Sequence, residues 1–407
     1  MMEQDVRRKL NINIVSPYWQ EAYEKVQQDQ DVPEWLMGVY YRRLHEEYQI
    51  FPENLELFVN AVEQIAQNED LCMLAKIIYE IIGLRTSSGE AFKEFEVPVA
   101  PEGTTETLAY DLVALFPVLA HIRPSWKELE KRGVEADVLR VRFSMLDSWI
   151  SGSVKTEGRP YFSKGSFLVY RAFVYVSELR LGRLRFQWVE HSNFFAKVFV
   201  NDKGDIRIMM DGITMHKSGH VLGTYGFTEE EGSFYAKVTE DEENYEGYAV
   251  EEETHLAQTV RTKLSKKEWK LCLAPGDAAL KVHIAGGPGF GPAECEEAFA
   301  MARELFPRCF PEYDFKGFVT HTWFLGPALE PALREGSNIK NFRNYFEIFP
   351  AKSNGNDVFQ YVYRQNVKTP AEVAIDELPE DNSLRKGIKE QLQKGNYIYE
   401  FNGFMRF

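Results

Sequence analysis

The sequence AALKVHIAGGPGFGP, at residues 278–292, combines a strand pattern, a glycine-rich turn and the first position of a helix. β-Branched and apolar residues alternate with other residues along Ala278–Ala285, which predicts a β-strand. Gly286–Gly291 follows at once as a turn. Pro292 suits the first helical position, because its missing N–H costs nothing there. The stretch therefore predicts a strand that passes through a tight turn into a helix.

The residues that follow complete a βαβ unit. Cys295, Phe299, Ala302 and Phe306 recur at helical spacing, so Pro292–Phe306 is predicted to be a helix with one buried face. Gly317–Leu325 then reads as a second strand. Two strands joined by a helix lie parallel, with a right-handed crossover. A glycine turn that leads into a helix N-terminus is a common place for a phosphate group.

Length, composition and charge favour a cytoplasmic protein of two domains. A chain of 407 residues is too long for one ordinary core. Its 44% hydrophobic and 27% charged residues are typical of a globular protein. The net charge of −15 argues against a general nucleic-acid or anionic-membrane partner. No apolar run approaches the ~20 residues of a membrane span, and the N-terminal residues show no apolar signal region.

The four cysteines suggest free thiols rather than a disulfide framework or a metal site. Cys72, Cys272, Cys295 and Cys309 contain no C-x-x-C pair and lie in apolar patterns. Reduced core thiols in a cytoplasmic protein are therefore expected, and we assign no metal ligands.

A domain boundary is expected near residue 155. Residues 1–155 carry successive helical periodicities, whereas Ser151–Lys164 is rich in glycine and proline. Residues 156–407 contain strand patterns, including a hairpin of Phe194–Val200 with Asp205–Met210. The expected fold is mixed α/β (α+β), with an all-helical N-terminal domain at 1–155 and a mixed β-sheet domain with flanking helices at 156–407.

Four further elements are predicted in the second half. The aromatic-rich run Phe167–Leu181 favours a helix, and Val358–Tyr363 favours a strand. Ser383–Lys394 is predicted to be a helix, with a capping residue before it and a glycine after it. Tyr397–Phe401 is the predicted closing strand.

A set of motifs runs in order through the second half of the chain. The motifs are Leu181–Gln187 (LGRLRFQ), Lys267–Leu271 (KEWKL), Leu273–Asp277 (LAPGD), His283-Ile284, Glu294-Cys295, His321–Leu325 (HTWFL), Ser337–Ile339 (SNI) with Phe342 and Phe346, and Leu378-Pro379 ahead of Ser383–Arg385 (SLR). Over roughly residues 135–407 the chain resembles bacterial acyltransferases with a GNAT-like C-terminal domain. Residues 1–134 are similar to that family's helical N-terminal domain in helical character.

The resemblance implies a GNAT-type mixed sheet and an enzymatic activity. The implied cosubstrate is acetyl-CoA or another acyl-CoA. The implied reaction is direct transfer of the acyl group to an amine or similar nucleophile on a small-molecule acceptor. The alternative is a catalytically inactive GNAT-like module that binds a ligand or a partner protein.

In GNAT enzymes, the CoA pyrophosphate rests on backbone amides within an Arg/Gln-x-x-Gly-x-Gly/Ala pattern. The resemblance assigns this contact to four glycines: Gly286, Gly287, Gly289 and Gly291. Glycines allow close backbone approach, and free N–H groups with the helix dipole favour an anion. No Arg or Gln begins the pattern, and Glu294, Glu296 and Glu297 place negative charge beside it, so a purely structural turn is the alternative. A nucleotide P-loop is excluded because the Gly-Lys-Ser/Thr ending is missing.

Two histidines, His283 and His321, lie on the two predicted strands of the βαβ unit. On parallel neighbours they approach one another near the strand ends, where open α/β sheets place ligands. A near-neutral imidazole can take a proton from an attacking ammonium group. We therefore expect His283 or His321 to act as the catalytic base, and the alternative for each is a buried, hydrogen-bonded histidine.

Two further residues are candidates for the cofactor site. Trp323 alternates with His321 in the predicted strand, so a pantetheine arm can lie along it, although core packing is the alternative. Asn338 opens a predicted helix, where a capping role is the alternative to a ligand contact. Tyr361 and Tyr363 are candidates for the general acid that protonates the leaving thiolate.

Overall fold

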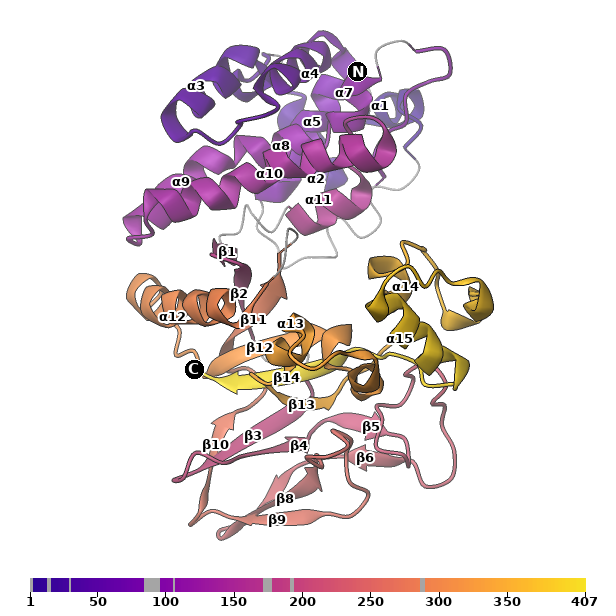
Figure 1. Ribbon diagram of the computed structural model, residues 1–407. Coiled ribbons are helices and arrows are strands. Elements are labelled where there is room, and N and C mark those ends of the chain that lie inside the picture. The colour runs from indigo at the N-terminus through magenta and orange to yellow at the C-terminus, as the bar shows by residue number, and fades with distance from the viewer. Residues whose placement is uncertain are drawn as a thin grey trace. The chain divides into compact units, whose positions relative to one another are not determined.

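The computed structural model describes residues 3–12, 16–28, 31–83, 96–104, 107–170, 178–190, 194–285 and 290–407. The chain divides into two compact units, Met1–Arg180 and Leu181–Phe407. The first unit is helical and the second is built on β-sheets (Figure 1), which confirms the expected fold class. The predicted domain limit between residues 155 and 156 stays a prediction. Within the described residues, no helix is both long and apolar enough to cross a bilayer.

The first unit consists of helices that pack together through buried apolar side chains. The helices are α1 (Glu3–Lys9), α2 (Trp19–Val26), η1 (Glu34–Leu36), α3 (Gly38–Tyr48), α4 (Leu55–Gln67), α5 (Glu69–Gly83), α7 (Leu108–Leu112), α8 (Leu115–Ala120), α9 (Ile122–Lys131), α10 (Ala136–Glu157) and α11 (Lys164–Tyr170). One buried carboxylate ties α10 to the start of α4. Asp147 is fully buried and accepts hydrogen bonds from the N–H groups of Glu53 at 3.1 Å and Asn54 at 2.9 Å. These N–H groups precede the helix and need an acceptor that the helix itself does not supply.

The second unit, together with the three residues that precede it, forms a six-stranded mixed sheet, which we call the first sheet. Its strands, in spatial order, are β1 (Glu178–Leu181), β2 (Leu184–Glu190), β11 (Ala278–Ile284), β12 (Gly317–Thr322), β14 (Phe401–Arg406) and β13 (Glu347–Pro350). β11 and β12 are parallel and are linked by α12 (Pro292–Cys309), which confirms the predicted βαβ unit. Phe299 of α12 packs against Phe186 and Phe318 of the sheet, with ring centroids 5.9 Å and 5.0 Å apart.

A second sheet packs against the other face of the first. Its strand order is β10 (Trp269–Leu273), β3 (Ala196–Asn201), β4 (Ile206–Met210), β8 (Asn244–Ala249) and β7 (Thr239–Glu240), and β9 (Thr262–Ser265) also pairs with β8. A separate two-stranded sheet is formed by β5 (Ile213–Met215) and β6 (Phe234–Ala236). The predicted β3–β4 hairpin is confirmed. Val198 and Met210 of this sheet share one buried cluster with Val319 and Phe404 of the first sheet. The face of the first sheet that carries Val319 therefore looks toward the second sheet.

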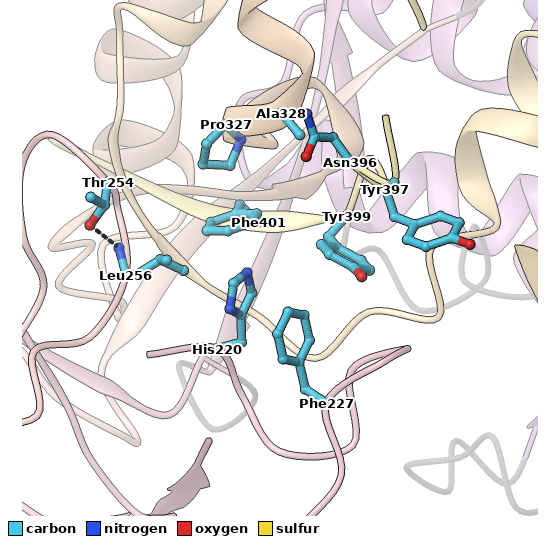
Figure 2. A pocket seen from close by; sticks show the side chains of 11 residues that line it. His220, Phe227, Thr254, Leu256, Pro327, Ala328, Asn396, Tyr397, Tyr399 and Phe401 are labelled. Carbon is cyan, nitrogen blue, oxygen red and sulfur yellow. Dashed lines mark hydrogen bonds between the residues drawn. The ribbon is translucent and has the colours of Figure 1, made fainter. Parts of the chain in front are cut away.

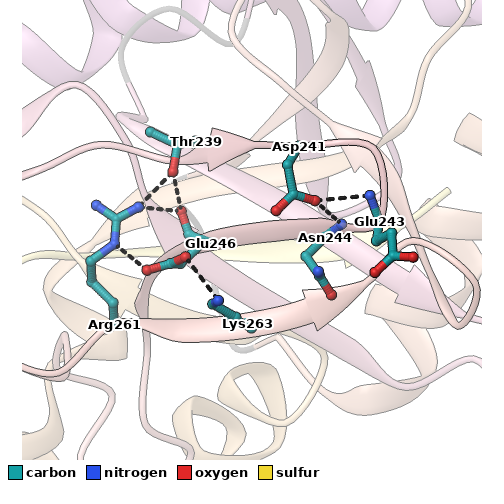
Figure 3. A network of polar contacts seen from close by, with 7 residues as sticks. All are labelled: Thr239, Asp241, Glu243, Asn244, Glu246, Arg261 and Lys263. Atoms are coloured by element: carbon teal, nitrogen blue, oxygen red, sulfur yellow. Dashed lines mark hydrogen bonds and ion pairs between the residues drawn. The ribbon is translucent and has the colours of Figure 1, made fainter.

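Charged side chains hold the outer strands of the second sheet together (Figure 3). The Arg261 Nε donates to a carboxylate oxygen of Glu246 at 3.0 Å. At the turn before β8, one Asp241 oxygen accepts from the N–H groups of Glu243 at 2.8 Å and Asn244 at 2.7 Å. These two hydrogen bonds hold the pKa of the Asp241 carboxyl below its usual range.

Outside the βαβ unit, three predicted elements were wrong in type or position. Residues 178–181, at the end of the predicted helix Phe167–Leu181, form β1, because a tight turn at Gly182 (φ 53°) pairs them with β2. The predicted strand Val358–Tyr363 is instead the helix α14 (Asp357–Tyr361), since a short apolar run satisfies either structure and tertiary packing decides. The closing strand begins at Phe401 rather than at Tyr397.

The remaining elements of the second unit are short helices. They are η4 (Trp323–Leu325), η5 (Pro327–Ala332), α13 (Asn338–Arg343), η6 (Pro370–Glu372), η7 (Ile375–Glu377) and α15 (Ser383–Gln393). The predicted helix Ser383–Lys394 is confirmed by α15, whose first turn is capped because the Asn382 side chain accepts from the N–H of Arg385.

Gly317, the first residue of β12, leaves no room for a side chain. A Cβ atom there would lie 2.3 Å from Phe404 Cε2 and 2.7 Å from the Met405 carbonyl oxygen. We expect Gly317→Ala to lower the free energy of unfolding by about 1–3 kcal/mol, because the backbone oxygen cannot move aside. Urea denaturation followed by circular dichroism measures this change.

The matched control is Gly152→Ala, in the interior of α10, where no described heavy atom other than the nearby backbone of the helix itself comes within 4 Å of the added Cβ. This substitution should raise the free energy of unfolding by about 0.5–1 kcal/mol through helix propensity. Equal effects of the two substitutions would contradict the packing described for β12.

Candidate functional site

A cavity of about 430 Å³ lies at the C-terminal ends of β11 and β12. Its walls comprise Val282–Ile284 of β11, Thr320–Thr322 of β12, and the side chains of Arg185, Trp323, Phe324, Asp357 and Tyr361. Both predicted catalytic histidines and Trp323 are among these residues. The ends of parallel strands are where open α/β sheets usually bind ligands.

The cavity exists because β11 and β12 separate along their length. Their parallel ladder consists of two residue pairs and ends at Lys281 and Val319. Just beyond it, the buried Thr320 hydroxyl donates a hydrogen bond to the Val282 carbonyl at 3.1 Å. This side-chain contact replaces the backbone pairing that a continued ladder would supply.

Each strand is nevertheless held on its outer side. β11 stays paired with β2 as far as Ile284, and β12 stays paired with β14 as far as Thr322. The inner backbone edges therefore remain extended after they part. Their N–H and C=O groups face a space between strands, where a bound molecule can take the place of a neighbouring strand.

His283 and His321 lie beside this gap. The register of the outer ladders places His283 opposite Arg185 and His321 opposite Asn402. If the parallel ladder continued by two residues, its register would place the two histidines side by side. Both histidines therefore lie near the C-terminal ends of β11 and β12, but the two strands part before reaching them, so their catalytic assignment stays a prediction.

His283 is neutral and hydrogen-bonded within the sheet. Its Nε2 lies 3.3 Å from the Gln187 side-chain oxygen, which assigns the imidazole proton to Nε2. Burial, with the nearby charges of Lys281 and Arg185, lowers the pKa of His283 to about 3. This histidine is thus a hydrogen-bond donor to the sheet and a weak base.

His321 has the geometry of a general base. Its Nδ1 lies 3.0 Å from the Asn402 side-chain oxygen, so Nδ1 carries the proton and Nε2 carries the lone pair. The ring is open to solvent through the cavity, and the surrounding protein lowers its pKa by partial desolvation. The hydrogen bond to Asn402 and the charge of Asp357 oppose that shift. His321 is therefore neutral at pH 7, with its Nε2 lone pair available to accept a proton.

A pair of carboxyl groups lies next to His321. Asp357 lines the cavity and is hydrogen-bonded to Glu400, which is 7% exposed and also contacts the Ser353 hydroxyl. Burial and the neighbouring Asp357 raise the pKa of Glu400 to about 7, and burial raises the pKa of Asp357. Two carboxylates this close cannot both ionise freely, so the pair holds one proton near neutrality.

Sequence reasoning missed this carboxyl pair. The two residues are 43 positions apart, and Asp357 begins α14, a helix that covers most of the segment predicted as a strand. No motif connects them, and only the fold brings them to the same place.

The two candidate tyrosines differ in position. Tyr361 lines the cavity, and burial with the charges of Asp357 and Glu400 raises the pKa of its hydroxyl. The Tyr363 hydroxyl donates to the Arg385 carbonyl at 2.7 Å and lies in the buried cluster around α15. Tyr361 is therefore the candidate with access to a bound thioester.

The glycine turn is described in part. Gly286, Gly287 and Gly289 lie outside the described residues, so their assignment stays a prediction. Gly291 is the N-cap of α12, and its N–H donates to the Glu294 carboxylate at 3.1 Å. A carboxylate from the helix itself thus occupies the first turn, as the charge pattern indicated.

Of the two further candidates for the cofactor site, Trp323 lines the cavity and Asn338 does not. Trp323 begins η4 rather than continuing the predicted strand, because the Thr322 hydroxyl accepts from the N–H of Phe324 and ends the strand. Trp323 is buried, packs edge-on against Phe324 and forms part of the cavity wall. Asn338 is the first residue of α13, whose cap is Ser337, and it is not one of the cavity-lining residues.

Comparison with known proteins places this geometry in a family. Residues 179–405 match the family model described as GNAT-like C-terminal domain. No curated protein sequence gives a match. The whole chain is similar in fold to a solved acyltransferase in complex with decanoyl-CoA, with 17% identity, a TM-score of 0.60 and 100% coverage of both chains.

Two further solved structures show the same likeness. One is an acyltransferase in complex with decanoyl-CoA and teicoplanin, and the other is an acyltransferase in complex with CoA and 10C-Teicoplanin. Each has 17% identity and a TM-score of 0.62, and the match covers 100% of this chain and 99% of the other. Because the family model spans more than half of its residues, the chain belongs to the family defined by the GNAT-like C-terminal domain.

Proposed function

We propose that the protein is an acyltransferase that moves an acyl group from an acyl-CoA donor to an amine or similar nucleophile by direct attack. The observation that carries this proposal is the opening between β11 and β12, with His321 and His283 on its walls. The similar solved structures support it, because their bound molecules include decanoyl-CoA and CoA.

The opening between the strands suits the pantetheine arm of an acyl-CoA. This arm contains amide groups, which can pair with the free inner edges of β11 and β12 as an added strand would. Trp323 supplies an apolar wall for the chain. The N-terminus of α12 and the glycine turn that precedes it are the proposed position of the pyrophosphate.

His321 is the proposed catalytic base. Its unprotonated Nε2 takes a proton from the acceptor amine, directly or through one water, as the nitrogen attacks the thioester carbonyl carbon. The new C–N bond forms, the carbonyl oxygen bears negative charge, and the C–S bond then breaks as the carbonyl reforms. Tyr361 donates its hydroxyl proton to the departing thiolate sulfur. The products are the acylated acceptor and CoA.

Other residues adjust the basicity of His321. Asn402 holds the proton on Nδ1 and so keeps Nε2 available. Any negative charge on Asp357 stabilises the imidazolium that forms during the reaction. His283, which donates to Gln187, is assigned a structural role in the same wall.

The proposed acceptor is a small molecule. Two of the similar solved structures contain teicoplanin or 10C-Teicoplanin, which provides a first acceptor to test. A catalytically inactive, ligand-binding protein is the second candidate function. The observation that favours it is the hydrogen bond between Glu294 and the Gly291 N–H, which places an acidic group at the proposed pyrophosphate position.

Acyl-CoA binding can be measured by isothermal titration with acetyl-CoA, octanoyl-CoA and decanoyl-CoA. We expect a dissociation constant in the micromolar range for at least one donor. Thr320→Val keeps the shape of the buried side chain but removes the hydroxyl that bonds to the Val282 carbonyl, and it should weaken that binding by about tenfold. Absence of heat with every donor at millimolar concentration would rule out the proposed cosubstrate.

Replacement of the base should affect turnover more than donor binding. We expect His321→Asn to lower kcat by about 10²–10⁴-fold and to leave the affinity for the best acyl-CoA nearly unchanged. The matched variant His283→Asn should have a much smaller effect on kcat, because that ring is a weak base. Release of the CoA thiol, with teicoplanin and simple amines as acceptors, measures turnover. A fully active His321→Asn enzyme would refute the assignment.

The pH dependence of kcat gives an independent test of His321. Only the neutral ring accepts a proton, so kcat falls as the pH drops below the pKa of His321. Since desolvation lowers this pKa, the acidic limb should have its midpoint below about 6.5. Asp357→Asn removes a charge that raises the pKa, so it should move the midpoint further toward acid. An unchanged or upward-shifted midpoint in this variant would show that another group titrates.

A further inference from the structure

A second cavity, of about 240 Å³, shares no lining residue with the cavity at β11 and β12. Aromatic side chains form much of its wall: Phe227, Tyr397, Tyr399 and Phe401, together with the imidazole of His220 (Figure 2). Its volume is below the ~300–1,000 Å³ of pockets for drug-sized ligands, so the cavity suits a small ligand with one ring or one fused ring system.

The wall is ordered by ring contacts and by hydrogen bonds inside the protein. The His220 and Phe227 rings are stacked, with centroids 3.9 Å apart and planes 12° apart. The Tyr399 ring meets both of them edge-on or nearly so. The Tyr399 hydroxyl donates to the Tyr225 carbonyl at 2.8 Å, and the Thr254 hydroxyl bonds to Glu251 at 2.8 Å. These hydroxyl groups are thus already committed to partners within the protein.

His220 is held by a tight turn that begins at His216. The N–H of His216 donates to the His220 carbonyl at 2.8 Å, and the N–H of Gly219 donates to the His216 carbonyl at 2.9 Å. Gly219 has a φ of 85°, and a Cβ there would lie 2.4 Å from the Ala257 carbonyl oxygen. The turn therefore requires glycine at this position, and its geometry is fixed on both sides.

The hydrogen bonds of this turn determine where the proton of His216 lies. The backbone N–H of Ser218 donates to His216 Nδ1 at 3.1 Å, so Nδ1 carries a lone pair. The proton of the neutral ring is then on Nε2, which contacts the carboxylate of Glu230. The Ser218 hydroxyl oxygen lies 2.7 Å from the same Nδ1. Two lone pairs repel at that distance, so the Ser218 hydroxyl proton points to His216.

The direction of this bond determines the tautomer of His220. The Ser218 hydroxyl oxygen also lies 2.9 Å from His220 Nδ1, and the single hydroxyl proton of Ser218 already points to His216. His220 Nδ1 must therefore be the donor. A neutral imidazole has a single N–H, so His220 Nε2 carries a lone pair. Figure 2 shows the His220 ring projecting toward Phe401 across the cavity.

We propose that this aromatic cavity is a second ligand site, which binds a small neutral aromatic molecule through a hydrogen bond from its N–H or O–H group to His220 Nε2. The ring of the ligand would lie among the aromatic side chains, where apolar burial and edge contacts stabilise it. The proposal is independent of the proposed acyl transfer, since the two cavities are formed by different residues.

The electrostatics of the cavity fit this chemistry. Burial and the neighbouring His216 lower the pKa of His220 to about 4, so the ring is neutral at physiological pH. The lone pair of a neutral imidazole accepts a hydrogen bond from a phenol O–H or an indole N–H. The same desolvation disfavours any positive charge in the cavity, so the site selects against cationic ligands.

The test uses indole and its isostere benzofuran, in which an oxygen atom replaces the N–H group. Isothermal titration of the full chain should show that indole binds about tenfold more tightly, which corresponds to one net hydrogen bond. His220→Phe keeps a ring to stack on Phe227 but removes the acceptor. In this variant, indole affinity should fall to that of benzofuran, and benzofuran affinity should stay unchanged.

Ser218→Ala provides a second variant, which removes the group that fixes the tautomer and leaves the cavity wall intact. It should reduce the preference for indole without altering benzofuran binding. A decanoyl-CoA titration of each variant should match the wild type, which separates this site from the proposed acyl-CoA site. Equal affinities for indole and benzofuran in the wild type, no binding of either at millimolar concentration, or an unchanged indole preference in His220→Phe would overturn the proposal.

Discussion

The site depends on one constraint: β11 and β12 part after two residue pairs while each remains hydrogen-bonded to its outer neighbour. Without the outer pairing with β2 and β14, strands that lose their ladder would be free to collapse together or fray. With that pairing, the inner edges stay extended and open. The hydrogen bond from Thr320 to the Val282 carbonyl satisfies the first group that the ladder leaves behind. The opening is thus a stable feature of the sheet rather than a defect in it.

The same sheet determines the chemistry of its histidines. Neighbouring strands supply an amide oxygen to each ring, Gln187 to His283 and Asn402 to His321, but to different nitrogens. One ring therefore keeps its proton on Nε2, and the other keeps it on Nδ1 with a lone pair on Nε2. A comparable control of tautomers operates at His216 and His220, where a backbone N–H and one serine hydroxyl set the direction of the hydrogen bonds. In both places, fixed hydrogen-bond partners decide which imidazole nitrogen carries the proton.

Local patterns predicted the elements whose signals are local. The strand, helix and second strand around residues 278–325, the β3–β4 hairpin and the capped helix α15 follow from periodicity and turn residues. Other features depend on tertiary contacts. Residues 178–181 pair with β2 despite their helical pattern, and Val358 and Phe359 pack as part of a helix. The pair of His283 and His321 was predictable because both lie on adjacent strands. The Asp357–Glu400 contact and the separation of the strands were not, since no local pattern encodes them.

The central claim is that the acyl-CoA donor binds between β11 and β12 with its thioester carbonyl carbon beside His321. A crystal structure with a ketone analogue of decanoyl-CoA, in which a methylene group between the sulfur and the carbonyl carbon prevents acyl transfer, tests it most directly. We expect the pantetheine arm to hydrogen-bond to the inner edges of both strands, with room for one acceptor atom about 3–3.5 Å from both the carbonyl carbon and His321 Nε2. An analogue bound elsewhere, with the gap between β11 and β12 filled by protein side chains, would contradict the claim.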